Sequence, residues 1–206
     1  MKGSFMKLTI LGSGTSQGIP VIACECAVCR STDTHDKRLR CSAMLEINGQ
    51  NIVIDAGPDF RCQMLRAGVK DLRAILLTHE HKDHIGGLDD VRAFNWVKQG
   101  AVDVYASLRT KNVVYKDYSY AFSENKYPGV PEINLHIVGE ESFYIDDTEF
   151  IPIPVMHYQL PVLGYRTGNF AYLTDANAIP EASMKKLAGV EYLVINALRK
   201  EPHLSH

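Results

Sequence analysis

Three histidines and one aspartate fall within residues 79–84 of this 206-residue chain. They are His79, His81, Asp83 and His84. The run at residues 72–77, apolar except for Arg73, ends one residue before them and predicts a buried strand, while Gly86-Gly87 follows closely behind. A dense group of ionisable side chains at the end of such a strand constrains the fold more than any other feature of the chain.

The spacing within this group predicts a metal site. Alternate residues of an extended segment point the same way, so His79 and His81 can reach one cation. Asp83 and His84 follow at once and can reach a second cation nearby. Imidazole nitrogens and carboxylate oxygens suit zinc, manganese or iron, and no thiolate is needed.

The remaining pattern predicts an α/β fold with two stacked sheets and helices outside. Residues 43–47 and 50–54 flank Asn48-Gly49, which is a strong signal for a two-residue hairpin. Further strands are predicted at 7–11, 102–106, 133–138, 142–145, 149–155, 165–166, 169–173 and 192–196, and helices at 59–67, 88–98, 108–122 and 181–187. No repeat or linker divides the chain, so residues 1–206 are expected to form one domain.

Composition narrows the class of protein. An apolar fraction of 46% is enough for a full core, and a net charge of −2 argues against a broad nucleic-acid surface. No apolar run is long enough to cross a bilayer, and residues 1–6 lack the apolar core of a signal peptide. We therefore expect a cytoplasmic protein without a membrane or nucleic-acid partner.

The five cysteines are unevenly distributed. Cys24, Cys26 and Cys29 form a tight cluster, whereas Cys41 and Cys62 stand alone, and Cys62 is expected to face the core from a helix. An odd count with a tight cluster is not typical of a disulfide framework and favours metal binding. Three thiolates need a fourth ligand to complete a tetrahedral site, and Cys41 is within reach along the sequence.

The motif at residues 79–84 resembles the signature of the metallo-β-lactamase superfamily. That resemblance implies a four-layer αββα sandwich with two adjacent divalent metals, Zn²⁺ or Mn²⁺. It implies that the first metal is held by His79, His81 and His157, that the second is held by Asp83 and His84, and that Asp175 bridges both. His157 and Asp175 each follow a predicted strand, where loop residues commonly gather into a site.

Asp55 ends another apolar strand and precedes Gly57. Taken alone, it could be a simple turn residue. The resemblance implies a buried carboxylate that hydrogen-bonds a metal-bound imidazole and holds it in one orientation.

Two further segments resemble one branch of the superfamily. The glycine-rich loop at residues 11–20 and the cluster Cys24-x-Cys26-x-x-Cys29 are similar to those of PhnP-type phosphodiesterases, a branch that also includes tRNA 3′-processing endonucleases. In PhnP-type proteins three cysteines and one histidine hold a structural zinc, so Cys41 is the rival to that histidine. The resemblance also implies a homodimer.

The segment at residues 196–206 resembles the part of the family that carries a non-ligand histidine. That histidine contacts the scissile phosphate and protonates the leaving oxygen. His206 is the better match and His203 the alternative. Family members continue with a further helix and strand that bring the last metal ligand, so the C-terminal portion of the fold is expected to be missing from this chain.

Together these features predict a metal-dependent phosphodiesterase acting on a small or cyclic phosphodiester. A hydroxide bridging the two metals would attack phosphorus. Asp83 would act in catalysis as a metal ligand, and His206 would donate a proton to the leaving oxygen. Arg166 and Arg199 are candidates for pairing with the substrate phosphate. The alternatives are a tRNA 3′-processing endonuclease, a thioester or lactone hydrolase on the same metals, and a catalytically incomplete metal-binding protein.

Overall fold

The computed structural model describes residues 6–198 and 200. The chain forms two compact units, Met1–His136 and Ile137–His206, and each contains one β-sheet.

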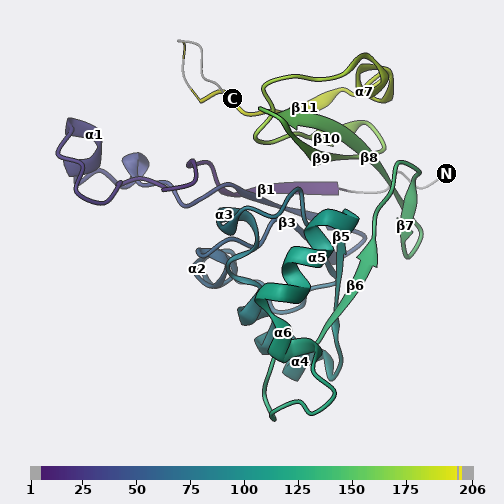
Figure 1. The fold of residues 1–206 in the computed structure, drawn as a ribbon. Coiled ribbons are helices and arrows are strands. Elements are labelled where there is room, and N and C mark those ends of the chain that lie inside the picture. The colour runs from purple at the N-terminus through teal and green to yellow at the C-terminus, as the bar shows by residue number, and fades with distance from the viewer. Residues whose placement is uncertain (1–5, 199, 201–206) are drawn as a thin grey trace. The chain divides into compact units, whose positions relative to one another are not determined.

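The first unit is built on a six-stranded sheet with the order β1-β2-β3-β4-β5-β6 (Figure 1). Its strands are β1 (Met6–Gly12), β2 (Ser42–Ile47), β3 (Gln50–Ile54), β4 (Ala74–Leu76), β5 (Val102–Ala106) and β6 (Ile133–Ile137). β2 pairs antiparallel with both β1 and β3, whereas β3, β4 and β5 run parallel to one another. Because the carboxyl ends of parallel strands meet at one edge, the residues that follow β3, β4 and β5 gather there.

The predicted hairpin is confirmed. Asn48 and Gly49 connect β2 to β3 with φ values of 52° and 79°. Two consecutive positive φ angles are the requirement of a type I′ turn, which matches the twist of the flanking strands.

Short helices accompany this sheet. They are α1 (Ala27–Arg30), η1 (Thr34–Asp36), α2 (Phe60–Ala67), α3 (Lys82–Ile85), η2 (Leu88–Val91), α4 (Arg92–Lys98), α5 (Leu108–Asp117) and α6 (Ser119–Phe122). The helix α2 buries Phe60, Gln63 and Met64. Cys62 lies between these positions and is exposed, so the expectation that it faces the core is wrong. The helical period turns it away from the buried side.

The single helix predicted for residues 108–122 is interrupted at Tyr118, which separates α5 from α6. Tyr118 has non-helical dihedral angles, with φ −112° and ψ 33°. Its side chain is buried, and its hydroxyl donates a hydrogen bond of 2.7 Å to the carbonyl of Ile85. Burial raises the pKa of Tyr118 to about 12. This tertiary contact accompanies the break in a segment whose local pattern favours one continuous helix.

The second unit carries a five-stranded sheet with the order β11-β10-β9-β8-β7. Its elements are β7 (Phe143–Ile145), β8 (Thr148–His157), β9 (Leu160–Thr167), β10 (Phe170–Tyr172), α7 (Glu181–Lys186) and β11 (Tyr192–Val194). The predicted pairing across Thr167-Gly168 is present as the β9–β10 hairpin. β9 begins five residues before the predicted start at Tyr165, because residues 160–166 pair with β8.

Each unit has its own apolar core. Residues from β2 to β6 and from α2, η2, α4 and α5 form the first. Inward-facing residues of β8, β9 and β10, such as Ile153, Val162 and Ala171, form the second. No helix in the described part of the chain is both long and apolar enough to cross a bilayer.

Candidate metal site

The histidine motif begins where β4 leaves the first sheet. All three residues of β4 are buried, and the strand lies between two parallel neighbours. Thr78 and His79 follow the strand and are also buried, and His81 then caps the short helix α3. A buried, doubly paired strand gives the motif a rigid base.

Thr78 links the motif to the end of β3. Its backbone N–H donates to Oδ1 of Asp55 at 2.8 Å, and its hydroxyl lies 2.8 Å from Oδ2 of the same carboxylate. The hydroxyl oxygen also lies 3.0 Å from Nδ1 of His79. When the hydroxyl donates to the carboxylate, it can accept from Nδ1–H of His79, which leaves Nε2 of that ring as a lone-pair donor for a cation.

His84 is oriented in a similar way. Its Nδ1 lies 2.7 Å from Oδ2 of Asp55, and both side chains are almost fully buried. A carboxylate accepting from Nδ1–H places the lone pair of His84 on Nε2, the atom that can act as a ligand. That Nε2 lies 3.3 Å from Oδ2 of Asp83. Asp55 therefore makes the contact with an imidazole that the resemblance implied.

The four donors of the motif fit a divalent cation site. Nε2 of His79 lies 2.9 Å from Nδ1 of His81, and the rings of His79 and His84 have centroids 4.1 Å apart. Nitrogen ligands 2.0–2.1 Å from a tetrahedral zinc lie roughly 3.3 Å from one another, so the nitrogens of His79 and His81 lie near the separation that one cation requires. Imidazole and carboxylate are also the donor types that zinc and manganese accept.

Two glycines allow the loop after β3 to approach the motif closely. A Cβ on Gly57 would overlap the carbonyl oxygen of Asp83, and one on Gly87 would overlap the carbonyl oxygen of Gly57. The two segments are joined by hydrogen bonds of 2.8 Å from Ala56 N to His84 O and from Gly87 N to Ala56 O. Any side chain at either glycine would push the loop that carries Asp55 away from the ligands.

The second unit presents His157 and Asp175. His157 is the last residue of β8, and Asp175 follows β10 with a positive φ of 53°. The neighbour of His157, Met156, exchanges hydrogen bonds with Asn177 and Ala178, from 2.8 to 3.4 Å. The segment that carries Asp175 therefore runs beside the end of β8 within this unit.

The structure thus brings together His79, His81, Asp83, His84 and Asp55 within the first unit. Thr78 was missed by the sequence reasoning. A threonine between a buried strand and the first histidine was the available signal, but its partner Asp55 lies 23 residues away. His206 and the alternative His203 lie outside the described residues, as does Arg199.

The cysteine cluster is compact. The Sγ atoms of Cys24, Cys26 and Cys29 all lie within 4.8 Å of one another. Two of them accept backbone hydrogen bonds, from Val21 N to Cys29 at 3.4 Å and from Cys29 N to Cys26 at 3.5 Å. The amide of Cys29, aided by the Cys24 thiol, lowers the pKa of Cys26 and favours its thiolate, the form that binds metal.

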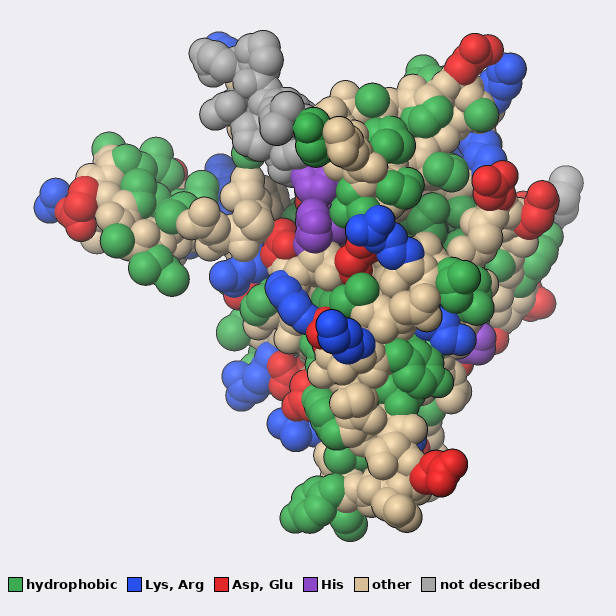
Figure 2. Space-filling model, viewed as in Figure 1, with side chains coloured by type: hydrophobic (Ala, Val, Ile, Leu, Met, Phe, Trp, Pro, Cys, Tyr) green, Lys and Arg blue, Asp and Glu red, His purple; other side chains and the backbone are tan. Residues whose placement is uncertain are grey.

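Cys41 lies outside this group of possible ligands, which has three members in the described part of the chain. The structure therefore gives no support to Cys41 as the fourth ligand. The segment around α1 also exposes Ile22 and Val28, at 94% and 45%. Figure 2 shows this segment on the left, with many hydrophobic side chains at its surface. Cysteine is coloured as hydrophobic in that picture.

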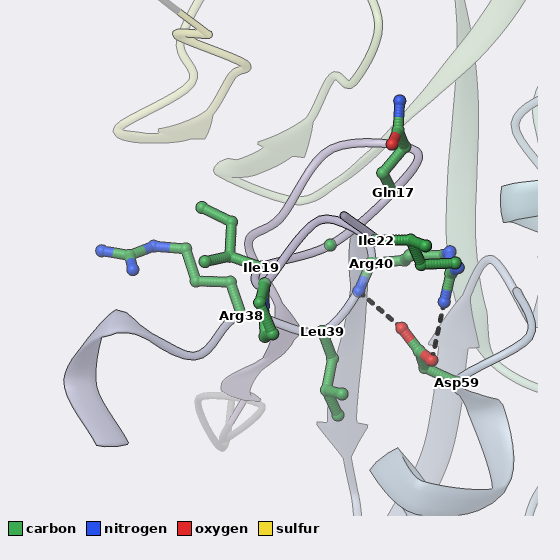
Figure 3. A pocket seen from close by; sticks show the side chains of 9 residues that line it. Gln17, Ile19, Ile22, Arg38, Leu39, Arg40 and Asp59 are labelled. Carbon is green, nitrogen blue, oxygen red and sulfur yellow. Dashed lines mark hydrogen bonds and ion pairs between the residues drawn. The ribbon is translucent and has the colours of Figure 1, made fainter. Parts of the chain in front are cut away.

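The glycine-rich loop packs against residues 38–40. Gly14 N donates to Leu39 O at 2.8 Å. Gly18 has a φ of 65°, and a Cβ at this position would lie 2.9 Å from the carbonyl oxygen of Arg38. A cavity of about 310 Å³ lies between the two segments (Figure 3). The Arg40 guanidinium beside it donates to Asp59 and to the carbonyl of Ser16, at 2.9 and 2.8 Å. Arg40 therefore fastens this loop to the start of α2.

Arg166 has a structural role in this structure. Its guanidinium donates to the carbonyls of Gly168 at 3.0 Å and Ala188 at 2.8 Å, and it also contacts Lys186 O. These bonds tie the β9–β10 turn to the end of α7. The hypothesis that Arg166 pairs with substrate phosphate is not supported, because its donors are directed at backbone carbonyls.

Residues 50–206 match the family model described as a beta-lactamase superfamily domain. The match covers more than half of the chain, so the chain belongs to this family and has the metallo-β-lactamase fold. The α/β class and the superfamily predicted from the motif are confirmed.

Individual relatives place the chain more narrowly. A crystal structure titled as a new diphosphatase from the PhnP family is 44% identical, with a TM-score of 0.89 over 98% of this chain and 78% of that one. This confirms the resemblance to PhnP-type proteins. A protein of Porphyromonas gingivalis named octanoyltransferase is 43% identical over 98% of this chain and 41% of its own length.

A ribonuclease Z of Nostoc punctiforme is 26% identical over 78% of this chain and 46% of its own length. The chain therefore spans less than half the length of these two curated relatives.

Proposed function

We propose that this chain is a metal-dependent hydrolase that cleaves a small phosphodiester or diphosphate. The observation that carries the proposal is the pair of imidazoles whose Nδ1 atoms are engaged by Asp55 and Thr78, so that their Nε2 atoms are left as donors beside His81 and Asp83. Such an arrangement is preorganised for divalent cations. The likeness to a PhnP-family diphosphatase supports phosphorus as the reacting centre.

The proposed ligand set also includes His157 and Asp175 from the second unit. His79, His81 and His157 would hold one cation, Asp83 and His84 the other, and Asp175 would bridge them. Both second-unit residues are at strand ends and only half-buried, so their side chains are accessible to a ligand. Bound divalent cations would acidify water and neutralise charge on phosphate oxygens.

The chain's own residues have separate tasks in this scheme. Asp55 and Thr78 hold the imidazole tautomers, and the buried strand β4 fixes where the motif begins. His206 is proposed as the acid that protonates the leaving oxygen, a task suited to an imidazole with a pKa near neutrality. The substrate would be a small molecule.

The test is turnover by the purified chain after removal of metal and reloading with Mn²⁺ or Zn²⁺. Bis(p-nitrophenyl) phosphate and a dinucleoside diphosphate are the probes. We expect hydrolysis that disappears with a chelator and returns with metal. Metal-loaded protein that leaves both probes intact would contradict the proposal.

An acyl substrate is the second candidate, because the relative from Porphyromonas gingivalis is named octanoyltransferase. The match covers 41% of that protein, so its name can describe the part that this chain does not match. Octanoyl thioester belongs in the same assay as a third probe. Metal-dependent thioester cleavage without phosphoester cleavage would favour the acyl candidate.

We also propose a structural zinc at Cys24, Cys26 and Cys29. The substitution Cys26→Ser is expected to lower bound zinc by about one ion per chain, because serine is a poor zinc ligand beside two thiolates. Inductively coupled plasma mass spectrometry measures the zinc content of each protein. Cys62→Ser is the matched control, because Cys62 is also an exposed cysteine but lies outside the cluster. Equal zinc in all three proteins would rule out the site.

A further inference from the structure

The residues between the metal ligands all face one helix. Glu80 lies in the loop between His79 and His81, and Lys82 is the first residue of α3. The Glu80 carboxylate accepts from Nε of Arg109 and from the hydroxyl of Thr110, the latter at 3.3 Å. Lys82 pairs with Asp117 at the other end of α5. Figure 1 shows α3, which begins at Lys82, and α5 in the same part of the first unit.

The contacts continue beyond the motif. The hydroxyl of Tyr118 donates to the carbonyl of Ile85 at 2.7 Å, and the hydroxyl of Tyr120 donates to Asp89 at 2.5 Å. Residues 80–89 are therefore held at four points by α5 and the residues after it. We call these four contacts the α5 brace; they are Glu80 with Arg109, Lys82 with Asp117, Ile85 with Tyr118, and Asp89 with Tyr120.

The helix that supplies the α5 brace is itself fixed. Val114 is fully buried in the first core, and Thr110 is 1% exposed. Ser107 caps the helix by accepting from Thr110 N at 3.1 Å. The Glu80 side chain is only 11% exposed and lies at the N-terminal turn, where the helix dipole favours negative charge. Glu80 is thus the best-buried charged contact of the brace.

We propose that Glu80 and Arg109 are positioning residues for the metal site. By holding the backbone between His79 and His81 against α5, they set the separation of the two imidazoles before metal binds. The proposal rests on the function proposed above, because it assigns the motif to metal binding. It concerns affinity for the cation and is independent of which substrate is cleaved.

The test uses Mn²⁺, which prefers oxygen and nitrogen donors. Binding to the thiolates of the cysteine cluster therefore does not contribute to the measured affinity. Arg109→Ala removes the partner of Glu80 at a position 63% exposed, so the fold is not at risk. We expect its dissociation constant for Mn²⁺, measured by electron paramagnetic resonance of the free ion, to rise about tenfold, as for other groups that orient ligands. Arg109→Lys should recover part of this loss.

Two controls separate positioning from general stability. Lys7→Ala removes another exposed ion pair, with Glu46 at 3.8 Å, and should leave Mn²⁺ affinity unchanged. The melting temperature of metal-free Arg109→Ala should stay within about 2 °C of the wild type, since the Arg109 side chain is 63% exposed and Glu80 keeps the Thr110 hydroxyl as a donor.

The outcomes are distinct. Equal Mn²⁺ affinity in wild type and Arg109→Ala overturns the α5 brace, even if phosphodiesters are hydrolysed. If Arg109→Ala loses tenfold in Mn²⁺ affinity but the wild type cleaves neither phosphorus probe, the α5 brace is supported and the proposed reaction is wrong. A metal-free melting temperature that falls steeply in Arg109→Ala would show that the contact serves folding, which also overturns the proposal.

Discussion

Replacing Asp83 with asparagine is expected to lower kcat for bis(p-nitrophenyl) phosphate on the order of 10³-fold, the size typical of removing a charge-stabilising group from an active site. Asp83 is the carboxylate of the motif, and its Oδ2 lies 3.3 Å from Nε2 of His84. Asparagine keeps the shape but loses the negative charge that the proposed cation needs. Steady-state kinetics with metal analysis would measure both losses.

Asp71→Asn is the matched control, because Asp71 is an exposed carboxylate of the same unit. It should leave kcat unchanged. If Asp83→Asn kept near-wild-type turnover at full metal content, Asp83 would have no place in the reaction. If metal content fell but activity persisted, the reaction would not depend on the cation at this position.

Asp55→Ala is expected to lower the free energy of unfolding of the metal-free protein by roughly 2–5 kcal/mol, because each buried donor left without an acceptor costs about 1–3 kcal/mol. Asp55 is fully buried and accepts from Thr78 N, from the Thr78 hydroxyl and from His84 Nδ1. Its φ of 64° adds a backbone cost for alanine. Urea unfolding in the presence of a chelator measures the change.

The backbone part of this effect can be isolated. Asp146 also has a positive φ, of 50°, and is exposed, so Asp146→Ala makes the same backbone change with only solvent-accessible contacts to lose and should cost only about 1 kcal/mol. Asp55→Asn keeps one acceptor oxygen and tolerates the left-handed backbone, so its effect should lie between the two. A loss no larger in Asp55→Ala than in Asp146→Ala would mean that the buried hydrogen bonds add nothing.

The sequence alone determined the strand β4, the hairpin at Asn48-Gly49 and the candidate ligands of the motif. These features are local. A short apolar run, a two-residue turn and donors within six residues can each be recognised without knowing which distant segments meet. The same holds for the cysteine cluster, whose three sulfur atoms the structure brings within 4.8 Å of one another.

Only the tertiary structure decided how these groups are held. Asp55 meets Thr78 across 23 residues, and Glu80 meets Arg109 across 29. The direction of Cys62, the exclusion of Cys41 from the cysteine cluster and the use of Arg166 on backbone carbonyls were likewise set by packing. Sequence spacing fixes which donors are near one another along the chain. Hydrogen bonds between segments far apart in the chain fix which nitrogen of each imidazole remains to bind a cation.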